Sequence, residues 1–401
     1  MILLRLDLEE FRIYRRVALE IPPAGLRLFG TNGSGKTSLL EAIYLLATTR
    51  SPRSSLDRDL INWESNAEFE LAPFARVSGH LAQADGIERD VEMALVADSV
   101  RPSVTRKRAK IDGRACRVVD LVGTLKVVLF SPEDLNLVLG SPSGRRRYLD
   151  ISISQFDRTY LRALSRYGKL VDRRNSLLKD LGSRSGGRVA EDELAYWDEE
   201  FTTYSAYILA ARIRYLAGLG FDAAEAFARL IGTESRLSLE YVASVDLPEA
   251  QVERIVSGSI EDAQPLIARS IASILRRRRQ EELRRGSTLI GPHRDDFTYA
   301  LDERSLSSFG SRGQQRLAVV ATKIAELSRI VAMTGEPPVL LLDDVLSELD
   351  PEHQEGLLQA LGNAGCQIIM TATSRDLLEH PALANLPIAS VNHCSITILN
   401  G

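Results

Sequence analysis

The segment from Leu26 to Thr37 reads LRLFGTNGSGKT, and it is the most informative stretch of the chain for its fold class. Its last eight residues fit the pattern G-x-x-x-x-G-K-[ST] of a phosphate-binding loop. A short apolar strand over 26–29 precedes this loop, and a helix with an apolar face (Leu39, Leu40, Ile43, Leu46) follows it. Strand, glycine loop and helix in this order predict a nucleotide site. A chance match is expected in only about one chain in a hundred at ordinary glycine content.

Each residue type in the loop suits phosphate binding. Glycines let backbone N–H groups point at phosphate oxygens, and the helix N-terminus adds the positive end of its dipole. Lys36 is expected to reach the β- and γ-phosphates and to assist catalysis, while the Thr37 hydroxyl is expected to ligate Mg²⁺. The predicted ATP-binding residues are Gly30, Thr31, Asn32, Gly33, Ser34, Gly35, Lys36, Thr37 and Ser38.

A second motif begins about 300 residues later, where the apolar run Val339–Leu342 ends in Asp343 and Asp344. Such a run is typical of a strand buried in a parallel sheet, and adjacent carboxylates at its end need a compensating cation or helix N-terminus. We predict that Asp343 holds Mg²⁺, usually through water, and that Asp344 is the catalytic acid that orients or polarises the attacking water. The alternative is that these acids cap a helix at a strand-to-helix turn.

The distance between Lys36 and Asp343 requires a sheet that assembles from both ends of the chain. Heads of the ABC ATPase class have this spacing, because a helical lobe is inserted between the two motifs. They also carry a serine-glycine turn that opens a helix, which corresponds here to Phe309–Arg316, FGSRGQQR. In such heads this turn serves the nucleotide of a second subunit, so the residues predicted to bind ATP across a dimer are Ser311, Gly313 and Gln314. The alternative is an ordinary N-capped helix.

A fourth motif, Ser347–Pro351 (SELDP), resembles the D-loop that crosses the same dimer interface. Asp350 is the candidate contact to the nucleotide site in this loop. Asp350 also suits the N-cap of a helix that has Pro351 at its first position, and the two roles are compatible.

Residue patterns divide the chain into three parts: an N-terminal half of an ATPase head (1–132), an inserted helical lobe (133–288) and a C-terminal half of the head (289–401). The first part alternates like strands, with Asp112-Gly113 as a hairpin turn. The lobe carries long amphipathic helices of some 30 residues each, joined by the glycine-rich linker 182–187. The predicted fold class is therefore α/β, an ABC-type P-loop ATPase head with an inserted helical lobe.

Composition excludes several classes of protein. Lys and Arg number 50 against 54 Asp and Glu, for a formal net charge of -4, so the chain is no general polycation. No run of 18 apolar residues and no signal-peptide core is found, which predicts a cytoplasmic protein without membrane contact. Three widely spaced cysteines (Cys116, Cys366, Cys394) predict neither a disulfide framework nor a zinc site.

Basic clusters remain as candidate contacts to DNA phosphates, with salt-bridged or solvated helix faces as the alternative. No aromatic residues interleave with them, so no base-stacking platform is evident. The clusters are Arg101–Lys110, Arg145–Arg147, Arg173-Arg174, Arg276–Arg279 and Arg284-Arg285.

Almost end to end, the chain resembles the RecF family of bacterial recombination-repair ATPases, which is related to the SMC heads. Phosphate-binding loops are generic, but three further stretches are highly specific to this family: Gly291–Asp296 (GPHRDD), Ser311–Arg316 (SRGQQR) and Leu340–Asp350 (LLLDDVLSELD). The segments 130–135 (FSPEDL) and 146–150 (RRYLD) add to the resemblance.

This resemblance implies that the protein binds ATP with Mg²⁺, hydrolyses it slowly as a switch, and forms an ATP-dependent homodimer. It also implies binding to DNA, including single-stranded and gapped duplex forms. With the partners RecO and RecR, a member of this family helps to load RecA, and it supports replication restart and SOS induction.

Two departures from the wider ABC pattern bear on hydrolysis. The acid after Asp343 is aspartate rather than the usual glutamate, and Thr371-Ala372-Thr373 stands where transporters carry a switch histidine. Both predict weak hydrolysis. The Q-loop glutamine is also missing near 130–133, which leaves the coupling of the lobe at that place open.

Rival classes fit the sequence less well. An ABC transport subunit predicts a short helical insertion, a Leu-Ser-Gly-Gly-Gln-like turn and the switch histidine, all of which this sequence lacks. An SMC-like structural head requires hundreds of heptad residues between its halves. A small-molecule P-loop kinase is disfavoured by the spacing of the two phosphate-site motifs.

Overall fold

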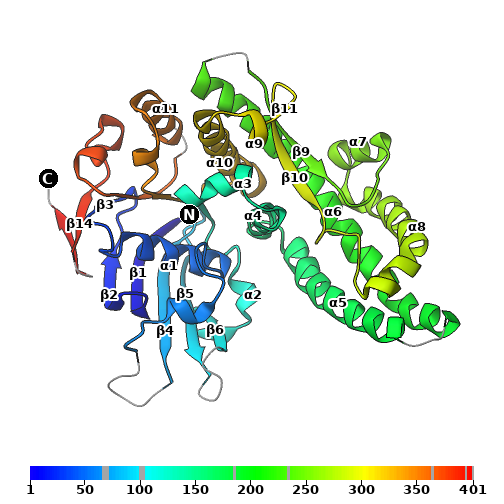
Figure 1. The fold of residues 1–401 in the computed structure, drawn as a ribbon. Helices are drawn as coiled ribbons and strands as arrows, with labels where there is room; N and C mark the ends of the chain where they lie inside the picture. The colour runs from blue at the N-terminus through cyan, green and yellow to red at the C-terminus, as the bar shows by residue number, and fades with distance from the viewer. Residues whose placement is uncertain are drawn as a thin grey trace. The chain divides into compact units, whose positions relative to one another are not determined.

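The computed structural model of the protein describes residues 1–65, 72–98, 104–183, 187–232, 235–362, 365–392 and 395–399. They divide into two compact units (Figure 1). The first unit comprises 1–134, 229–232 and 320–401, and the second comprises 135–228 and 233–319. Three features of the sequence fall wholly or partly outside the described residues: Cys394, the start of the Arg101–Lys110 cluster and the linker 182–187.

A mostly parallel sheet forms the centre of the first unit, with strand order β15-β14-β3-β13-β12-β8. Only the β14–β15 pair is antiparallel. The strands are β3 (Gly25–Phe29), β8 (Val127–Phe130), β12 (Val339–Asp343), β13 (Ile368–Ala372), β14 (Ile388–Asn392) and β15 (Ser395–Leu399). Strands from both ends of the chain therefore lie side by side, which confirms the ABC-type arrangement expected from the motif spacing.

A second, antiparallel sheet lies in the same unit, in the order β2-β1-β4-β5-β6-β7. Its strands are β1 (Ile2–Phe11), β2 (Tyr14–Glu20), β4 (Phe74–Ala82), β5 (Glu88–Ala97), β6 (Thr105–Ile111) and β7 (Arg114–Cys116). The predicted hairpin turn is confirmed, because Asp112 and Gly113 join β6 to β7 with positive φ values of 50° and 72°.

Both faces of the parallel sheet are buried. Alternate residues of β12 pack into two different cores: Val339 and Leu341 join the core that contains α1 and the antiparallel sheet, whereas Leu340 and Leu342 join the core that contains α11. This explains the continuous apolar run of the strand. The helical segments of the unit are α1 (Lys36–Thr48), η1 (Asp57–Leu60), α2 (Val118–Leu121), η2 (Pro132–Leu135), η3 (Val345–Glu348), α11 (Pro351–Gly362), η4 (Asp376–Leu378) and η5 (Pro381–Leu383). The last residue of η2, Leu135, belongs to the second unit.

The second unit is mainly helical. Its helices are α3 (Asn136–Leu139), α4 (Pro142–Ser154), α5 (Arg158–Ser183), α6 (Gly187–Ile231), α7 (Glu249–Ser257), α8 (Ile260–Arg285), α9 (Leu306–Phe309) and α10 (Arg312–Thr334), of which α6 and α10 continue into residues of the first unit. The expected length of some 30 residues is wrong for α6, which has 45. Its buried side continues through Leu216, Leu219 and Phe227, so apolar packing accompanies the helix beyond the expected length.

A small antiparallel sheet, β11 (Arg304–Ser305), β10 (Asp296–Leu301) and β9 (Leu237–Val242), completes the second unit. The β9–β10 register runs from Asp296 opposite Val242 to Leu301 opposite Leu237. Residues 289–319 therefore belong to the second unit, whereas the sequence pattern placed them in the C-terminal half of the head.

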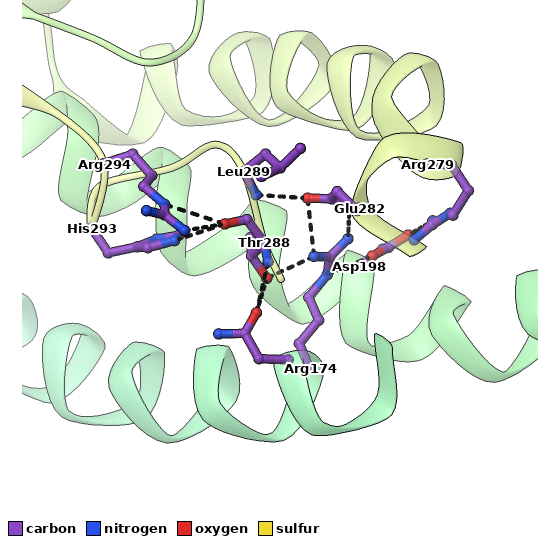
Figure 2. A network of polar contacts seen from close by, with 9 residues as sticks. Arg174, Asp198, Arg279, Glu282, Thr288, Leu289, His293 and Arg294 are labelled. Carbon is purple, nitrogen blue, oxygen red and sulfur yellow. Dashed lines mark hydrogen bonds and ion pairs between the residues drawn. The ribbon is translucent and has the colours of Figure 1, made fainter. Parts of the chain in front are cut away.

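A buried polar network connects the helices of this unit (Figure 2). Arg174 on α5 is fully buried and donates to Glu282 on α8 (2.6 and 3.2 Å) and to Asp198 on α6 (3.0 Å). Burial opposes the charge of Arg174, but hydrogen bonds and the nearby carboxylates outweigh it and raise its pKa. Arg279 also pairs with Asp198. The network thus joins three helices, with the Arg174–Glu282 pair fully buried and Asp198 and Arg279 partly exposed.

His293 links two segments of the second unit. Its Nδ1 lies 2.6 Å from the Tyr167 hydroxyl, and its Nε2 lies 3.4 Å from the Thr288 carbonyl. Burial lowers the pKa of His293 to about 4, with the charge of Arg294 acting in the same direction. Burial also raises the pKa of Tyr167, so its hydroxyl stays protonated and donates to the neutral imidazole.

A pH dependence of stability follows from this histidine. The unfolded imidazole takes up a proton near pH 6.5, whereas the folded one resists protonation down to about pH 4. Its contribution to the free energy of unfolding is therefore present above pH 6.5 and is lost as the pH falls, by about 2 kcal/mol at pH 5. Urea unfolding at pH 7 and pH 5 should show a smaller loss for His293→Gln than for the unchanged protein. Equal losses would contradict this account.

No helix of the described residues is both long enough and apolar enough to cross a membrane.

Candidate functional site

The phosphate loop joins β3 to α1, as predicted. Its tip, Thr31, Asn32 and Gly33, is exposed, while Gly30, Ser34, Gly35 and Lys36 are buried and Thr37 and Ser38 are half-buried. Gly35 precedes α1 with φ at 112°, and a Cβ atom on it would lie 2.4 Å from the Tyr14 hydroxyl. Only glycine suits that backbone and that contact, so the tight turn into the helix depends on it.

Lys36 places its ammonium group across the loop. Its Nζ donates to the carbonyl oxygens of Gly30 (2.7 Å) and Thr31 (3.0 Å). Burial lowers the pKa of Lys36, and the carboxylates of Asp344 and Asp343 oppose that effect. The loop and the two acids thus share one electrostatic environment, which is the arrangement expected for a phosphate and metal site.

Asp343 lies beside the loop, at the end of β12. Its Oδ1 accepts hydrogen bonds from Thr37 (2.8 Å) and from Thr371 on β13 (2.9 Å). Burial raises the pKa of Asp343, while these two hydrogen bonds lower it. The two oxygen groups predicted to share Mg²⁺ therefore touch each other, although 306 positions separate them in the sequence.

Asp344 does not act as a helix cap, which was the alternative for these acids. Its backbone is left-handed, with φ at 52°, and its side chain makes no capping hydrogen bond to η3. Its Oδ1 and the Ser34 Oγ are buried, with no hydrogen-bond partner in the part of the chain that the structure describes. A buried oxygen of this kind costs about 1–3 kcal/mol unless another group satisfies it.

ATP with Mg²⁺ fits this set of groups. Lys36 and the loop N–H groups suit phosphate oxygens, Thr37 and Asp343 suit the metal, and Asp344 carries an unsatisfied acceptor for water. A bound Mg²⁺ would supply positive charge to the phosphates. Holding these groups in place is the task of the chain itself, which does so through α1, β12 and β13.

Three residues beside Asp343 were not assigned to the site from the sequence. Thr371 also accepts a hydrogen bond from the Asp344 N–H (3.0 Å), so it holds both acids. Arg53 and Glu133 lie 3.5 Å apart, and their charges lower and raise the pKa of Asp343, respectively. Since Phe130 of β8 lies opposite Leu342, the chain after β8 leaves the sheet next to Asp343. The sequence signal for Thr371 and Glu133 was their position at or just beyond the carboxyl end of a strand, whereas Arg53 follows α1 and carried no such signal.

The serine-glycine turn lies in the second unit, at the start of α10. The Ser311 Oγ accepts from the Gln314 N–H (3.2 Å), and the Gln314 side chain accepts from the Ser311 N–H (2.9 Å). This is a capping box, so the capping role of Ser311 is confirmed. Ser311 and Gly313 are exposed, and their predicted contact with the nucleotide of a second subunit stays a prediction.

Asp350 is the N-cap of α11, which begins at Pro351. Its carboxylate accepts from the His353 N–H (3.1 Å) and lies 2.6 Å from the His353 ring. These hydrogen bonds lower the pKa of Asp350. The capping role is confirmed, while the predicted role in the D-loop stays a prediction.

Most of the basic clusters contain salt-bridged residues, which agrees with the alternative to DNA contact that the sequence left open. Acid partners are found for Arg106, Lys107, Lys110, Arg145, Arg174, Arg279 and Arg285. In contrast, no acid partner is found among the described residues for Arg108, Arg146, Arg173, Arg276–Arg278 and Arg284. Several cluster members therefore remain for an external anion.

Comparison with known proteins agrees with this geometry. The family described as RecF/RecN/SMC N terminal domain matches residues 2–395. The chain is 49% identical over 392 residues to a DNA replication and repair protein RecF of Thermomicrobium roseum, covering 98% of each chain. It is 41% identical over 398 residues to the protein of that name in Herpetosiphon aurantiacus, covering 97% of each.

Solved structures give the same result. The chain superposes with a TM-score of 0.82 on a structure of the recombination mediator protein RecF with ATP in the RecFOR pathway, at 30% identity and 99% coverage of both chains. An SMC head domain of Pyrococcus furiosus matches with a TM-score of 0.52 at 16% identity, covering 99% of this chain and 95% of that one, and this match supports the fold alone.

Proposed function

The chain belongs to the RecF family, and we propose that it is an ATP-dependent DNA-binding protein of recombinational repair and replication restart. The observation that carries this proposal is that the Thr37 hydroxyl contacts Asp343, whose charge also acts on Lys36, an arrangement that suits phosphate and a metal ion. The ATP-bound RecF structures with which the chain superposes support the same nucleotide.

In the proposed cycle, ATP and Mg²⁺ bind at the phosphate loop and two heads then pair. Ser311, Gly313, Gln314 and Asp350 of one head contact the nucleotide of the other. Exposure of Ser311 and Gly313 at a helix N-terminus supports this role, because such an end attracts anions. The paired head binds single-stranded or gapped duplex DNA and acts with RecO and RecR to load RecA and support SOS induction.

Hydrolysis in this proposal is slow and serves to release the pair. Asp344 orients the attacking water, and its carboxylate is one methylene shorter than the usual glutamate. Thr371 fixes the backbone N–H of Asp344, and Thr373, not a histidine, stands directly after β13. Asp344 is therefore held firmly at its backbone, but its shorter side chain reaches less far toward the phosphate.

Light scattering tests the central step. At one fixed concentration, the mass should rise from 44.3 kDa to about twice that value when ATP and Mg²⁺ are added. The affinity for gapped duplex DNA should be higher with ATP than without it. A mass that stays at 44.3 kDa, both with and without DNA, would contradict ATP-driven pairing.

Replacing Ser311 with arginine should block pairing while ATP binding stays intact. The substitution places a bulky cation where the partner's phosphate is proposed to lie. It also removes a helix cap, which costs about 1 kcal/mol by itself. Ser259→Arg is the matched control, because Ser259 caps α8 in the same way. Normal ATP-dependent pairing of the Ser311 variant would refute the composite site.

A further inference from the structure

The loop between α8 and β10 contains the GPHRDD motif, to which the proposed function assigns no task. Among residues 286–296, only Arg294 has an exposed side chain. The neighbouring Gly291, Pro292 and Asp295 are buried. The segment is therefore an internal loop that presents one arginine at the surface.

Hydrogen bonds from several elements hold this loop. The Thr288 hydroxyl accepts a hydrogen bond from Arg174 Nη1 (2.8 Å; Figure 2). The Thr288 N–H donates to the side chain of Asn175 (2.7 Å). Farther along, Arg212 on α6 donates to the Pro292 carbonyl (2.7 Å). Two of these three anchors act on the backbone and leave little freedom in the path of the chain.

Asp295 anchors the other end of the loop. Its carboxylate accepts from the Tyr241 hydroxyl on β9 (2.8 Å) and from the Ser244 N–H (2.7 Å). Buried charges such as Arg174, Arg212 and Glu282 are costly to desolvate, and they are weak evidence for stability. Their arrangement around one loop is better explained by the need for a single loop conformation.

Arg294 is held by the backbone and not by an acid. Its Nε and Nη2 donate to the Thr288 carbonyl (3.3 and 3.1 Å; Figure 2). Arg146 on α4 is held in the same way, with Nη1 donating to the Asp295 carbonyl (2.7 Å). Among the described residues neither arginine has a carboxylate partner, whereas the adjacent Arg145 is paired with Asp296 through two bonds of 2.7 Å.

Both guanidinium groups bond to carbonyl oxygens of this one loop, Arg294 to that of Thr288 and Arg146 to that of Asp295. Alongside burial, both charges also lower the pKa of His293, which lies between these two carbonyls in the sequence. Two like charges are therefore held on the same loop by carbonyl groups that orient them without neutralising them. Such a pair favours an anion that accepts from both forks, and phosphate is an anion whose oxygens match the geometry of guanidinium groups.

We propose that Arg294 and Arg146 bind phosphates of the DNA backbone. This inference rests on the proposed DNA-binding function and assigns a site to it. An acidic protein partner is the weaker candidate, because protein interfaces use apolar or aromatic anchors, and no apolar side chain of residues 286–296 is exposed. Contacts to phosphates alone are independent of base sequence, as a general repair protein requires.

The test is the salt dependence of binding to a gapped duplex, with ATP present. Each lost phosphate contact reduces the slope of log K against log salt by about 0.9. Arg294→Ala and Arg146→Ala should each bind the gapped duplex about tenfold more weakly at ~0.1 M salt. In the double variant, the magnitude of the slope of log K against log salt should fall by about 1.8. Arg294→Lys keeps the charge and should retain most of the slope.

Arg114→Ala is the control for net charge, because Arg114 is an exposed arginine of the first unit. It should leave the slope unchanged. Circular dichroism and ATP affinity confirm that each variant is folded, and Arg294→Lys tests the site if an alanine variant unfolds. An unchanged slope in the double variant would overturn the inference, as would a loss of pairing without a loss of DNA affinity. If the unchanged protein bound no DNA, the proposed function itself would fail.

Discussion

Replacing Lys36 with methionine is expected to weaken ATP binding at least ~100-fold and to abolish ATP-dependent pairing. The ammonium group is the main cation of the phosphate loop, and hydrogen bonds to charged groups contribute about 1.5–3 kcal/mol each. Methionine has nearly the same length and is apolar, so it suits the buried position. The fold should therefore survive, since burial already disfavours the charge and lowers the pKa of Lys36.

Titration with a fluorescent ATP analogue measures the affinity, and light scattering measures the pairing. Lys169→Met is a suitable control, because Lys169 is exposed on α5. It should change neither quantity. If the Lys36 variant bound ATP within a few-fold of the unchanged protein, the loop would not be the nucleotide site, and the proposed function would lose its main support.

Replacing Arg174 with methionine is expected to lower the free energy of unfolding by about 3–5 kcal/mol. Glu282 would then keep a charge in a fully buried position without its cation, and Thr288 would lose a donor. Urea unfolding measures the effect. The double variant Arg174→Met/Glu282→Leu should recover much of the loss, because it removes the unpaired charge as well.

Arg285→Met is the control for Arg174→Met. It breaks the exposed pair with Glu281 on the same helix, and it should cost less than ~1 kcal/mol. A similarly small cost for Arg174→Met would mean that water reaches the network. The loss of structure around Thr288 should also weaken DNA binding if Arg294 is the phosphate contact.

Local motifs were readable because their chemistry is local. The P-loop glycines, the apolar run of β12, the Asp112-Gly113 turn and the capping box at Ser311 each express a backbone requirement within a few residues. Periodicity located the helices well, but it did not predict that α6 would reach 45 residues. Helix ends depend on packing and caps, so length is less well encoded than location.

The chain's own residues specify an α/β head with a phosphate loop and a distant acidic strand, because glycine conformation and burial of apolar runs are short-range demands. The contacts between Thr37, Asp343 and Thr371 arise from strand order, which pairs segments hundreds of residues apart. The same holds for the network around Arg174 and Thr288. A buried charge is tolerated only where several elements bring it partners, and no local pattern records which partners those are.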